Sequence, residues 1–235
     1  MMRLITSTLG RKFIMAFTGA ALFLFAFGHM VGNLQFFLGA EAINRYGHFL
    51  QSNVELLWPV RLGLLAMVGL HIWSAASLTR ENRAARPVPY ADWKPNSASY
   101  ASRTMVMSGV IIAAFIIYHL LHYTVQLPSI NFTGTDFHGL NETLPDGSER
   151  HDIHQMMILG FSRPLVSLFY IIAVGLLCLH LSHGVSAMFQ SLGLNNHNSR
   201  PILDKAAQAI ALVLFLGYAS IPVAVLLTQC GGHCK

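Results

Sequence analysis

Five long apolar stretches dominate this sequence and constrain its fold more than any other feature. An α-helix needs about 20 mainly apolar residues to cross a hydrocarbon core of about 30 Å, and each stretch is long enough. Of all residues, 54% are hydrophobic and only 11% are charged, which is far from the composition of a soluble domain. The sequence therefore predicts an all-α, multi-pass membrane protein, with residues 1–235 as one membrane domain. Its five transmembrane helices are expected at about 13–38, 58–78, 104–127, 165–189 and 206–227.

Basic residues between these stretches predict the orientation of the chain. They precede the first stretch, separate the second from the third, and separate the fourth from the fifth, whereas the segment between the third and fourth is mainly acidic. By the positive-inside rule the N-terminus is then cytoplasmic and the C-terminus outside. The first stretch lacks a convincing cleavage site and is interpreted as a retained span. The net charge of +5 does not indicate a nucleic-acid partner, because the basic residues form no aromatic-rich patch.

Histidines occur within four of the five stretches. Ionisable side chains inside a membrane are costly, so they mark candidate functional sites. At 1.5 Å per residue, His29 and His119 lie about 25 and 24 Å from the inner ends of their helices. On the same basis, His71 and His180 lie about 14 and 15 Å from theirs. The sequence thus predicts two histidine pairs at matched depths, one in the outer half of the membrane and one in the inner half.

Two imidazoles on different helices can bind one iron from opposite faces and leave no open position on it, which suits electron transfer. The absence of a Cys-x-x-Cys-His sequence favours b-type haem, with two centres about 10 Å apart along the membrane normal. For any single histidine, the alternative is a hydrogen-bonded contact between helices. His122 and His183 each follow a predicted ligand by three residues. We interpret them as partners of the ligands or of the haem propionates.

Glycines near these histidines suggest room for a flat porphyrin. Gly28 and Gly32 flank His29, Gly69 precedes His71, and Gly184 follows His183. A residue without a side chain allows close approach of the backbone, although the same glycines also suit helix packing.

The N-terminal sequence carries a family resemblance. GRKFIMAFTG at residues 10–19, followed by GHMVGNL at 28–34, resembles the start of cytochrome b558-type anchor subunits of succinate dehydrogenase and fumarate reductase. The likeness extends through residues 39–50 and to the five-helix plan, and so covers nearly the whole chain. It implies that His29 and His119 ligate a distal haem, while His71 and His180 ligate a proximal haem that faces an iron-sulfur subunit.

The resemblance also implies partners and a reaction. Dicarboxylate chemistry would occur on a flavoprotein at the cytoplasmic side of a bacterial inner membrane, with FAD and iron-sulfur clusters only in the partner subunits. This chain would hold two haem b groups and exchange electrons with a membrane quinone, menaquinone being favoured and ubiquinone left open. A higher oligomer of the complex is allowed, and lipid surrounds the chain.

One position departs from the family pattern. Some fumarate reductase anchors have a proton-accepting glutamate in the first external loop, where this chain has Gln51, which cannot accept a proton in that way. Glu55 is a candidate for this role instead, and the direction and the site of the quinone reaction stay open. Arg45, Arg61 and Arg163 lie near the outer boundary, where they would contact haem propionates, a quinone carbonyl or lipid headgroups.

Two other functions are weaker interpretations. A cytochrome b subunit of a formate dehydrogenase or hydrogenase also uses membrane histidines, but the match around His29 disfavours it. A histidine-containing metal or proton transporter is disfavoured because no span centre contains Asp or Glu. In the tail, Cys230 and Cys234 allow a disulfide, and a metal site including His233 is the weaker alternative.

Overall fold

The structure is a computed structural model that describes residues 7–85 and 100–232. Within these residues, five helices are long and apolar enough to cross a membrane, which confirms the predicted all-α membrane protein. Their ends lie within several residues of the predicted ones. The spans are Thr8–Leu38, Val54–Ala84, Met105–Thr124, Pro164–Ser191 and Arg200–Thr228.

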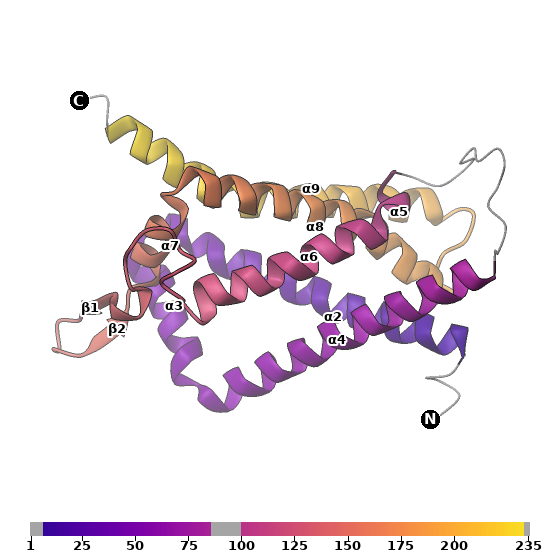
Figure 1. The fold of residues 1–235 in the computed structure, drawn as a ribbon, viewed down its shortest axis with the longest axis horizontal. Helices are drawn as coiled ribbons and strands as arrows, with labels where there is room; N and C mark the ends of the chain where they lie inside the picture. Colours follow the sequence, from indigo (N-terminus) through magenta and orange to yellow (C-terminus); the bar gives the residue numbers. More distant parts are fainter. Residues whose placement is uncertain (1–6, 86–99, 233–235) are drawn as a thin grey trace. The chain divides into compact units, whose positions relative to one another are not determined.

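The helical labels of Figure 1 subdivide these spans. The first consists of α2 (Thr8–Leu34) and the 3₁₀ turn η1 (Gln35–Leu38), and the third consists of α6 (Met105–His119) and the π-helical turn η2 (Leu120–Thr124). The others are α4 (Val54–Ala84), α8 (Pro164–Ser191) and α9 (Arg200–Gly232). Shorter elements are α3 (Ala40–Ser52), α5 (Tyr100–Arg103), η3 (Phe137–Gly139), β1 (Asn141–Thr143), β2 (Glu149–His151) and α7 (Ile153–Phe161).

Contacts between residues divide the chain into two compact units. Unit 1 comprises residues 1–26, 60–109 and 178–212, and unit 2 comprises residues 27–59, 110–177 and 213–235. Each long helix contributes residues to both units. Each unit contains one of the predicted histidine pairs.

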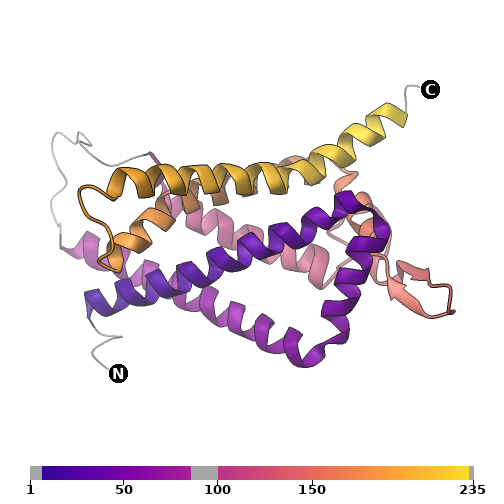
Figure 2. The same cartoon turned by 180° about the vertical axis from the view of Figure 1, so that it is seen from behind.

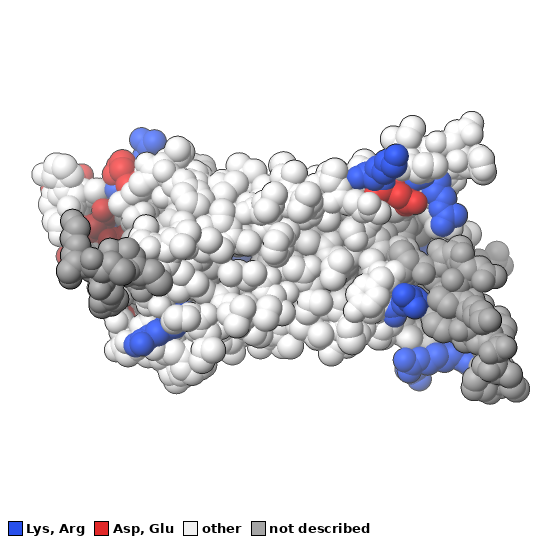
Figure 3. Space-filling model, turned by 90° about the horizontal axis from the view of Figure 1, so that it is seen from above, with Lys and Arg blue, Asp and Glu red and all other residues white. Residues whose placement is uncertain are grey.

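The side chains of the spanning helices suit a lipid environment. Only 11–33% of each span's most apolar window is buried inside the protein. Large apolar side chains such as Leu24 (67% exposed) and Leu65 (66% exposed) point outward instead. On the face shown in Figure 3, a broad area carries neither acidic nor basic side chains. Such a surface is stable where hydrocarbon replaces water.

Unit 2 also contains a small ordered cap built from α3, α7 and the β1–β2 hairpin, which gather together in Figures 1 and 2. The strands are antiparallel and place Glu142 opposite Arg150. Gly147 adopts a φ of 83° in the connecting turn, a conformation that glycine reaches without strain. The sequence alone does not predict this hairpin. Strands of three residues are too short to produce a recognisable alternation of apolar and polar side chains.

Candidate functional site

The unit 1 pair consists of His71 on α4 and His180 on α8, which come together as the sequence predicts. Their ring centroids are 6.5 Å apart with an interplanar angle of 62°. Both side chains are half-buried. The Nδ1 atom of His71 lies 3.1 Å from the Oγ1 atom of Thr18 on α2, and the Nδ1 atom of His180 lies 3.1 Å from the Oγ atom of Ser108 on α6.

The two hydroxyl groups determine which nitrogen of each ring carries the proton. Thr18 donates its hydrogen to the carbonyl of Ile14 (2.7 Å), and Ser108 donates to the carbonyl of Met105 (3.1 Å). Each hydroxyl oxygen is therefore the acceptor toward histidine, so the ring donates from Nδ1–H. A neutral imidazole with its hydrogen on Nδ1 presents the lone pair of Nε2 to a metal. Thr18 and Ser108 are buried, and sequence reasoning missed both.

A glycine follows each of these hydroxyl residues and lies against the same ring, closely at Gly19 and at ordinary van der Waals distance at Gly109. A Cβ atom on Gly19 would lie 3.3 Å from His71 Cε1, and one on Gly109 would lie 3.6 Å from His180 Cε1. The glycines that the sequence analysis named near the histidines do not lie against a histidine ring in this way. A Cβ on Gly28, Gly69 or Gly184 would meet nothing within 4 Å among the described residues, and one on Gly32 would meet the ring of Tyr46. The signal that was overlooked is the repeated hydroxyl-Gly dipeptide.

The unit 2 pair consists of His29 on α2 and His119 at the end of α6, also as predicted. Their ring centroids are 5.9 Å apart with an interplanar angle of 78°. The Nδ1 atom of His119 lies 3.4 Å from the hydroxyl of Tyr170 on α8. The ring of Tyr218 on α9 lies 6.2 Å from that of His29, centroid to centroid.

The spacing of both pairs fits one metal ion held between two imidazoles. A ligating nitrogen lies about 2 Å from its metal and about 1 Å from its own ring centre, so two rings on opposite faces have centroids about 6 Å apart. The observed distances of 5.9 and 6.5 Å bracket this value. A haem could be held by two such histidines without further protein donors to its iron, so this donor set fits haem.

Unpaired polar atoms lie close to the predicted ligands in the sequence. Among the described residues, three buried side-chain atoms have no hydrogen-bond partner: Ser74 Oγ, His122 Nε2 and Tyr123 Oη. Ser74 and His122 each follow a predicted ligand by three residues, and Tyr123 follows one by four, so each lies on the same helix face as that ligand. Buried polar groups are normally paired, so their clustering here supports a bound group beside the ligands. The residues of both sites therefore fit haem.

The comparison with protein families agrees with this geometry. Residues 79–218, more than half of the chain, match the model of the family described as succinate dehydrogenase/fumarate reductase transmembrane subunit. The chain belongs to this family. A comparison with the curated proteins gave no match, and a comparison with the solved structures gave none either.

The matched region divides the predicted ligands of this transmembrane subunit. His119 and His180 lie within residues 79–218, whereas His29 and His71 lie before them. The match thus supports the family through α6, α8 and most of α9. The N-terminal resemblance around His29 is a separate observation.

The two additional histidines have different surroundings. His122 is fully buried in the π-helical turn η2, and its Nδ1 atom lies 3.0 Å from the hydroxyl of Tyr170. His183 on α8 interacts electrostatically with Asp204 on α9, whose carboxylate accepts a hydrogen bond from Ser186. His122 therefore contacts a partner of the predicted ligand His119, whereas His183 lies beside an acidic group of unit 1.

The remaining predicted contact residues are on the protein surface. Arg45, Arg61, Arg163 and Glu55 have exposed side chains. Gln51 lines a cavity of about 210 Å³ in unit 2. The other residues lining this cavity are Thr124, Gln126, His138 and His151. The cavity is rich in hydrogen-bonding groups. Gln126 is buried and has a positive φ of 56°. Its Nε2 donates to His151 Nε2 at 3.1 Å.

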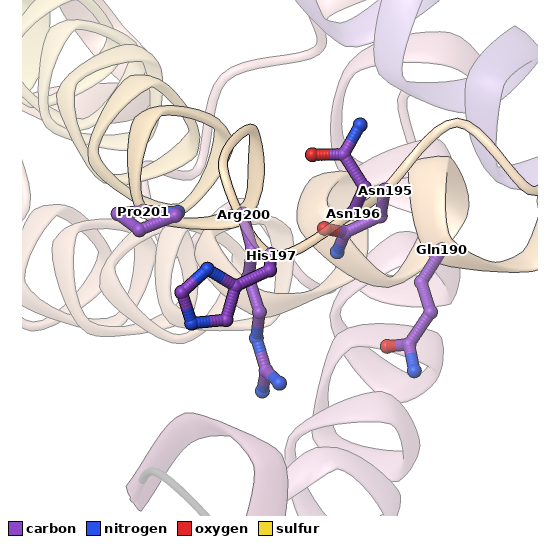
Figure 4. A pocket seen from close by; sticks show the side chains of 6 residues that line it. All are labelled: Gln190, Asn195, Asn196, His197, Arg200 and Pro201. Carbon is purple, nitrogen blue, oxygen red and sulfur yellow. The ribbon is translucent and has the colours of Figure 1, made fainter.

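A larger cavity, of about 470 Å³, lies in unit 1 where α8 connects to α9. Figure 4 shows the side chains of His197 and Arg200 next to each other at this turn. Asn196 organises the turn, since its Oδ1 accepts hydrogen bonds from the backbone N–H groups of Asn198 and Ser199. The cavity contains none of the predicted ligands. Gln190, Asn195 and Pro201 complete its lining.

A buried cation holds the cap of unit 2 together. The side chain of Arg150 is 5% exposed and forms ion pairs with Glu41 on α3 and Glu142 on β1. The hydrogen bond from Arg150 lowers the pKa of Glu41, assisted by the positive charges of Arg150 and Arg45. Asn44 is fully buried and donates to Glu142 (2.8 Å) and Asp152 (3.0 Å), so that α3 is tied to both ends of the hairpin.

Several predictions fall on residues outside this description. His233 and Cys234 of the tail lie beyond residue 232, and the side chain of Cys230 is not described. The disulfide and the metal site considered for the tail therefore stay predictions.

Proposed function

We propose that this chain is the di-haem b membrane anchor of a succinate:quinone or quinol:fumarate oxidoreductase. The observation that carries the proposal is the pairing of four histidines, each pair joining two helices at a spacing suited to one iron. In this proposal His71 and His180 ligate one haem in unit 1, and His29 and His119 ligate the other in unit 2. Held between two imidazoles, each haem would pass single electrons and would offer no open position to a substrate.

The protein's own groups would hold the ligands in the required state. Thr18 and Ser108 keep the hydrogen of each unit 1 ligand on Nδ1, which leaves Nε2 available for iron. The apolar surroundings keep water away from the rings. Electrons would pass between an iron-sulfur subunit, itself served by a flavoprotein, and a membrane quinone. The dicarboxylate would react on the flavoprotein and not on this chain.

The quinone contacts are proposed near the cavity of unit 2. Its amide and imidazole groups can donate hydrogen bonds to quinone carbonyls, which is the chemistry that recognition of a quinone requires. Gln51 lies at this cavity, so it would orient the quinone without accepting its proton. We propose a bacterial inner membrane location, with the N-terminus and the partner subunits on the cytoplasmic side. Menaquinone is the favoured quinone.

Purification with the partner subunits and a reduced-minus-oxidised optical spectrum test the proposal. The expected result is a b-type spectrum with two haems per chain and quinone-dependent oxidation of succinate, or reduction of fumarate by quinol. A preparation that retains the partner subunits but contains no haem would refute the di-haem assignment. Assays with ubiquinone and menaquinone analogues would then identify the quinone.

A further inference from the structure

Tyr170 occupies a bridging position in unit 2. Its side chain is 6% exposed on α8, and its hydroxyl lies 3.0 Å from His122 Nδ1 and 3.4 Å from His119 Nδ1. Both neighbours therefore meet the hydroxyl through the same type of ring nitrogen. A phenol has a single hydrogen, so it can donate to only one of the two rings and must accept from the other.

The proposed ligand role of His119 determines which group donates in each of these two hydrogen bonds. To bind iron through Nε2, His119 must carry its hydrogen on Nδ1, from which it donates to the oxygen of Tyr170. Tyr170 then donates its own hydrogen to His122 Nδ1. His122 consequently carries its hydrogen on Nε2, which is buried and has no partner among the described residues.

Unit 1 offers a contrast within the same protein. The hydroxyls that accept from His71 and His180 give their hydrogens to backbone carbonyls of their own helices, at Ile14 and Met105. In unit 1 each series of hydrogen bonds therefore ends at a backbone carbonyl and reaches no second side chain. In unit 2 the hydroxyl gives its hydrogen to another buried imidazole instead, so the ligand His119 is linked to a second side chain that can polarise the hydroxyl.

We propose that Tyr170 and His122 are positioning residues that fix the tautomer of His119 and lower the reduction potential of the unit 2 haem. This inference rests on the proposed function, since it requires haem at His119. A hydrogen bond accepted from Nδ1–H makes Nε2 a stronger electron donor, which stabilises oxidised iron over reduced iron. The hydrogen bond from Tyr170 to His122 strengthens the effect, because linked hydrogen bonds polarise one another.

The test is a redox titration of the purified complex, followed optically, on Tyr170→Phe and His122→Leu variants. Both should retain two haems per chain. In Tyr170→Phe, one haem should shift to a more positive midpoint potential while the other stays unchanged. His122→Leu should shift the same haem in the same direction by a smaller amount, because the hydroxyl still accepts from His119.

Two further variants separate this role from packing. His122→Asn places an amide oxygen near the former Nδ1 position and should restore the potential toward that of the unsubstituted protein. Tyr118→Phe removes a hydroxyl that donates to the carbonyl of Ile130 (3.3 Å), and it should shift neither haem. Tyr118 is a matched control because its ring also lies beside His122, with the centroids 5.5 Å apart.

The outcomes separate this inference from the proposed function. Two haems with unchanged potentials in Tyr170→Phe would overturn the inference and leave the di-haem assignment intact. A haem-free unsubstituted complex would overturn the proposed function instead. If Tyr170→Phe loses a haem or does not fold, the comparison of His122→Leu with His122→Asn decides: equal potentials in these two variants would overturn the inference.

Discussion

His71 and Thr18 lie on different helices, 53 residues apart in the sequence, with 3.1 Å between Nδ1 of the ring and Oγ1 of the hydroxyl. The contact is repeated by His180 and Ser108 on the next pair of helices. Each hydroxyl is followed by a glycine that faces the same ring. The two predicted ligands of unit 1 thus contact equivalent dipeptides, Thr18-Gly19 and Ser108-Gly109, through the hydroxyl groups.

Replacement of Thr18 by valine tests whether this contact orients His71, since valine keeps the branched shape and removes the hydroxyl. His71 would lose the acceptor that keeps its hydrogen on Nδ1, and we expect roughly 10- to 100-fold weaker haem binding in unit 1. Haem content after graded detergent washing, together with the optical spectrum, measures the loss. Thr228→Val is the matched control, because among residues 7–85 and 100–232 the hydroxyl of Thr228 donates only to carbonyls of its own helix. Equal haem retention in both variants would contradict this orienting role.

Substitution of single ligands should remove one haem at a time. His71→Ala should eliminate the unit 1 haem and leave the unit 2 haem largely intact, whereas His29→Ala should do the reverse, because each pair lies within its own unit. Haem stoichiometry and low-temperature spectra of the two variants provide the measurement. His197→Ala changes an exposed histidine at the α8–α9 turn and should keep both haems. If His71→Ala and His29→Ala removed the same haem, the pairing would be wrong.

The sequence was sufficient to predict the five spans and both histidine pairs, for a physical reason. Helices that cross a membrane have a fixed rise per residue, so distance along the chain converts directly into depth. His29 and His119 could therefore be matched without knowledge of how their helices pack. The family match begins at residue 79, after His71, so it contains only one histidine of each pair and the ligand pairing still depends on geometry.

The partners of the ligands could not be predicted in the same way. Thr18 contacts His71 only because of the rotation of α2 about its axis, and depth along the membrane contains no information on that rotation. Tyr170 was missed because a tyrosine in an apolar span is ordinary, and its contacts depend on the π-helical turn that reorients His122. The hairpin was missed because each of its strands has only three residues, too few to show an alternation of apolar and polar side chains.

Removal of the buried cation should destabilise the cap of unit 2. In Arg150→Met, Glu142 keeps its hydrogen bond from Asn44 but loses the cation, and Glu41 returns to water. Glu41 is well exposed, so the loss comes mainly from Glu142, and we expect about 1.5–3 kcal/mol less free energy of unfolding, typical of hydrogen bonds to charged groups. Thermal denaturation of the purified protein and protease cleavage of the hairpin measure it. Arg163→Met, at an exposed position, is the control and should change neither.

Acidification should weaken the same cap through His151. The pKa of His151 is lowered from its ordinary value of 6.5, chiefly by burial. A hydrogen bond with the backbone of Leu140 and the charge of Asp152 raise this pKa, and the charge of His138 lowers it, but burial has the largest effect. The folded state therefore binds fewer protons than the unfolded state between the two pKa values. The resulting stability is complete above 6.5 and is lost as the pH falls through the folded-state pKa.

Substitution of His151 by glutamine isolates this contribution, because glutamine is neutral at every pH and still has a hydrogen-bond donor and an acceptor. Denaturation temperatures at about pH 7.5 and about pH 5 should differ more in the unsubstituted protein than in His151→Gln. Any acid sensitivity that persists in the variant comes from carboxylates such as Glu41. Because the pKa of Glu41 is lowered, its contribution to stability is lost at a lower pH than that of His151. An identical pH dependence of the two proteins would show that His151 titrates alike in the folded and unfolded chains. It would then contribute nothing to the acid response of the cap.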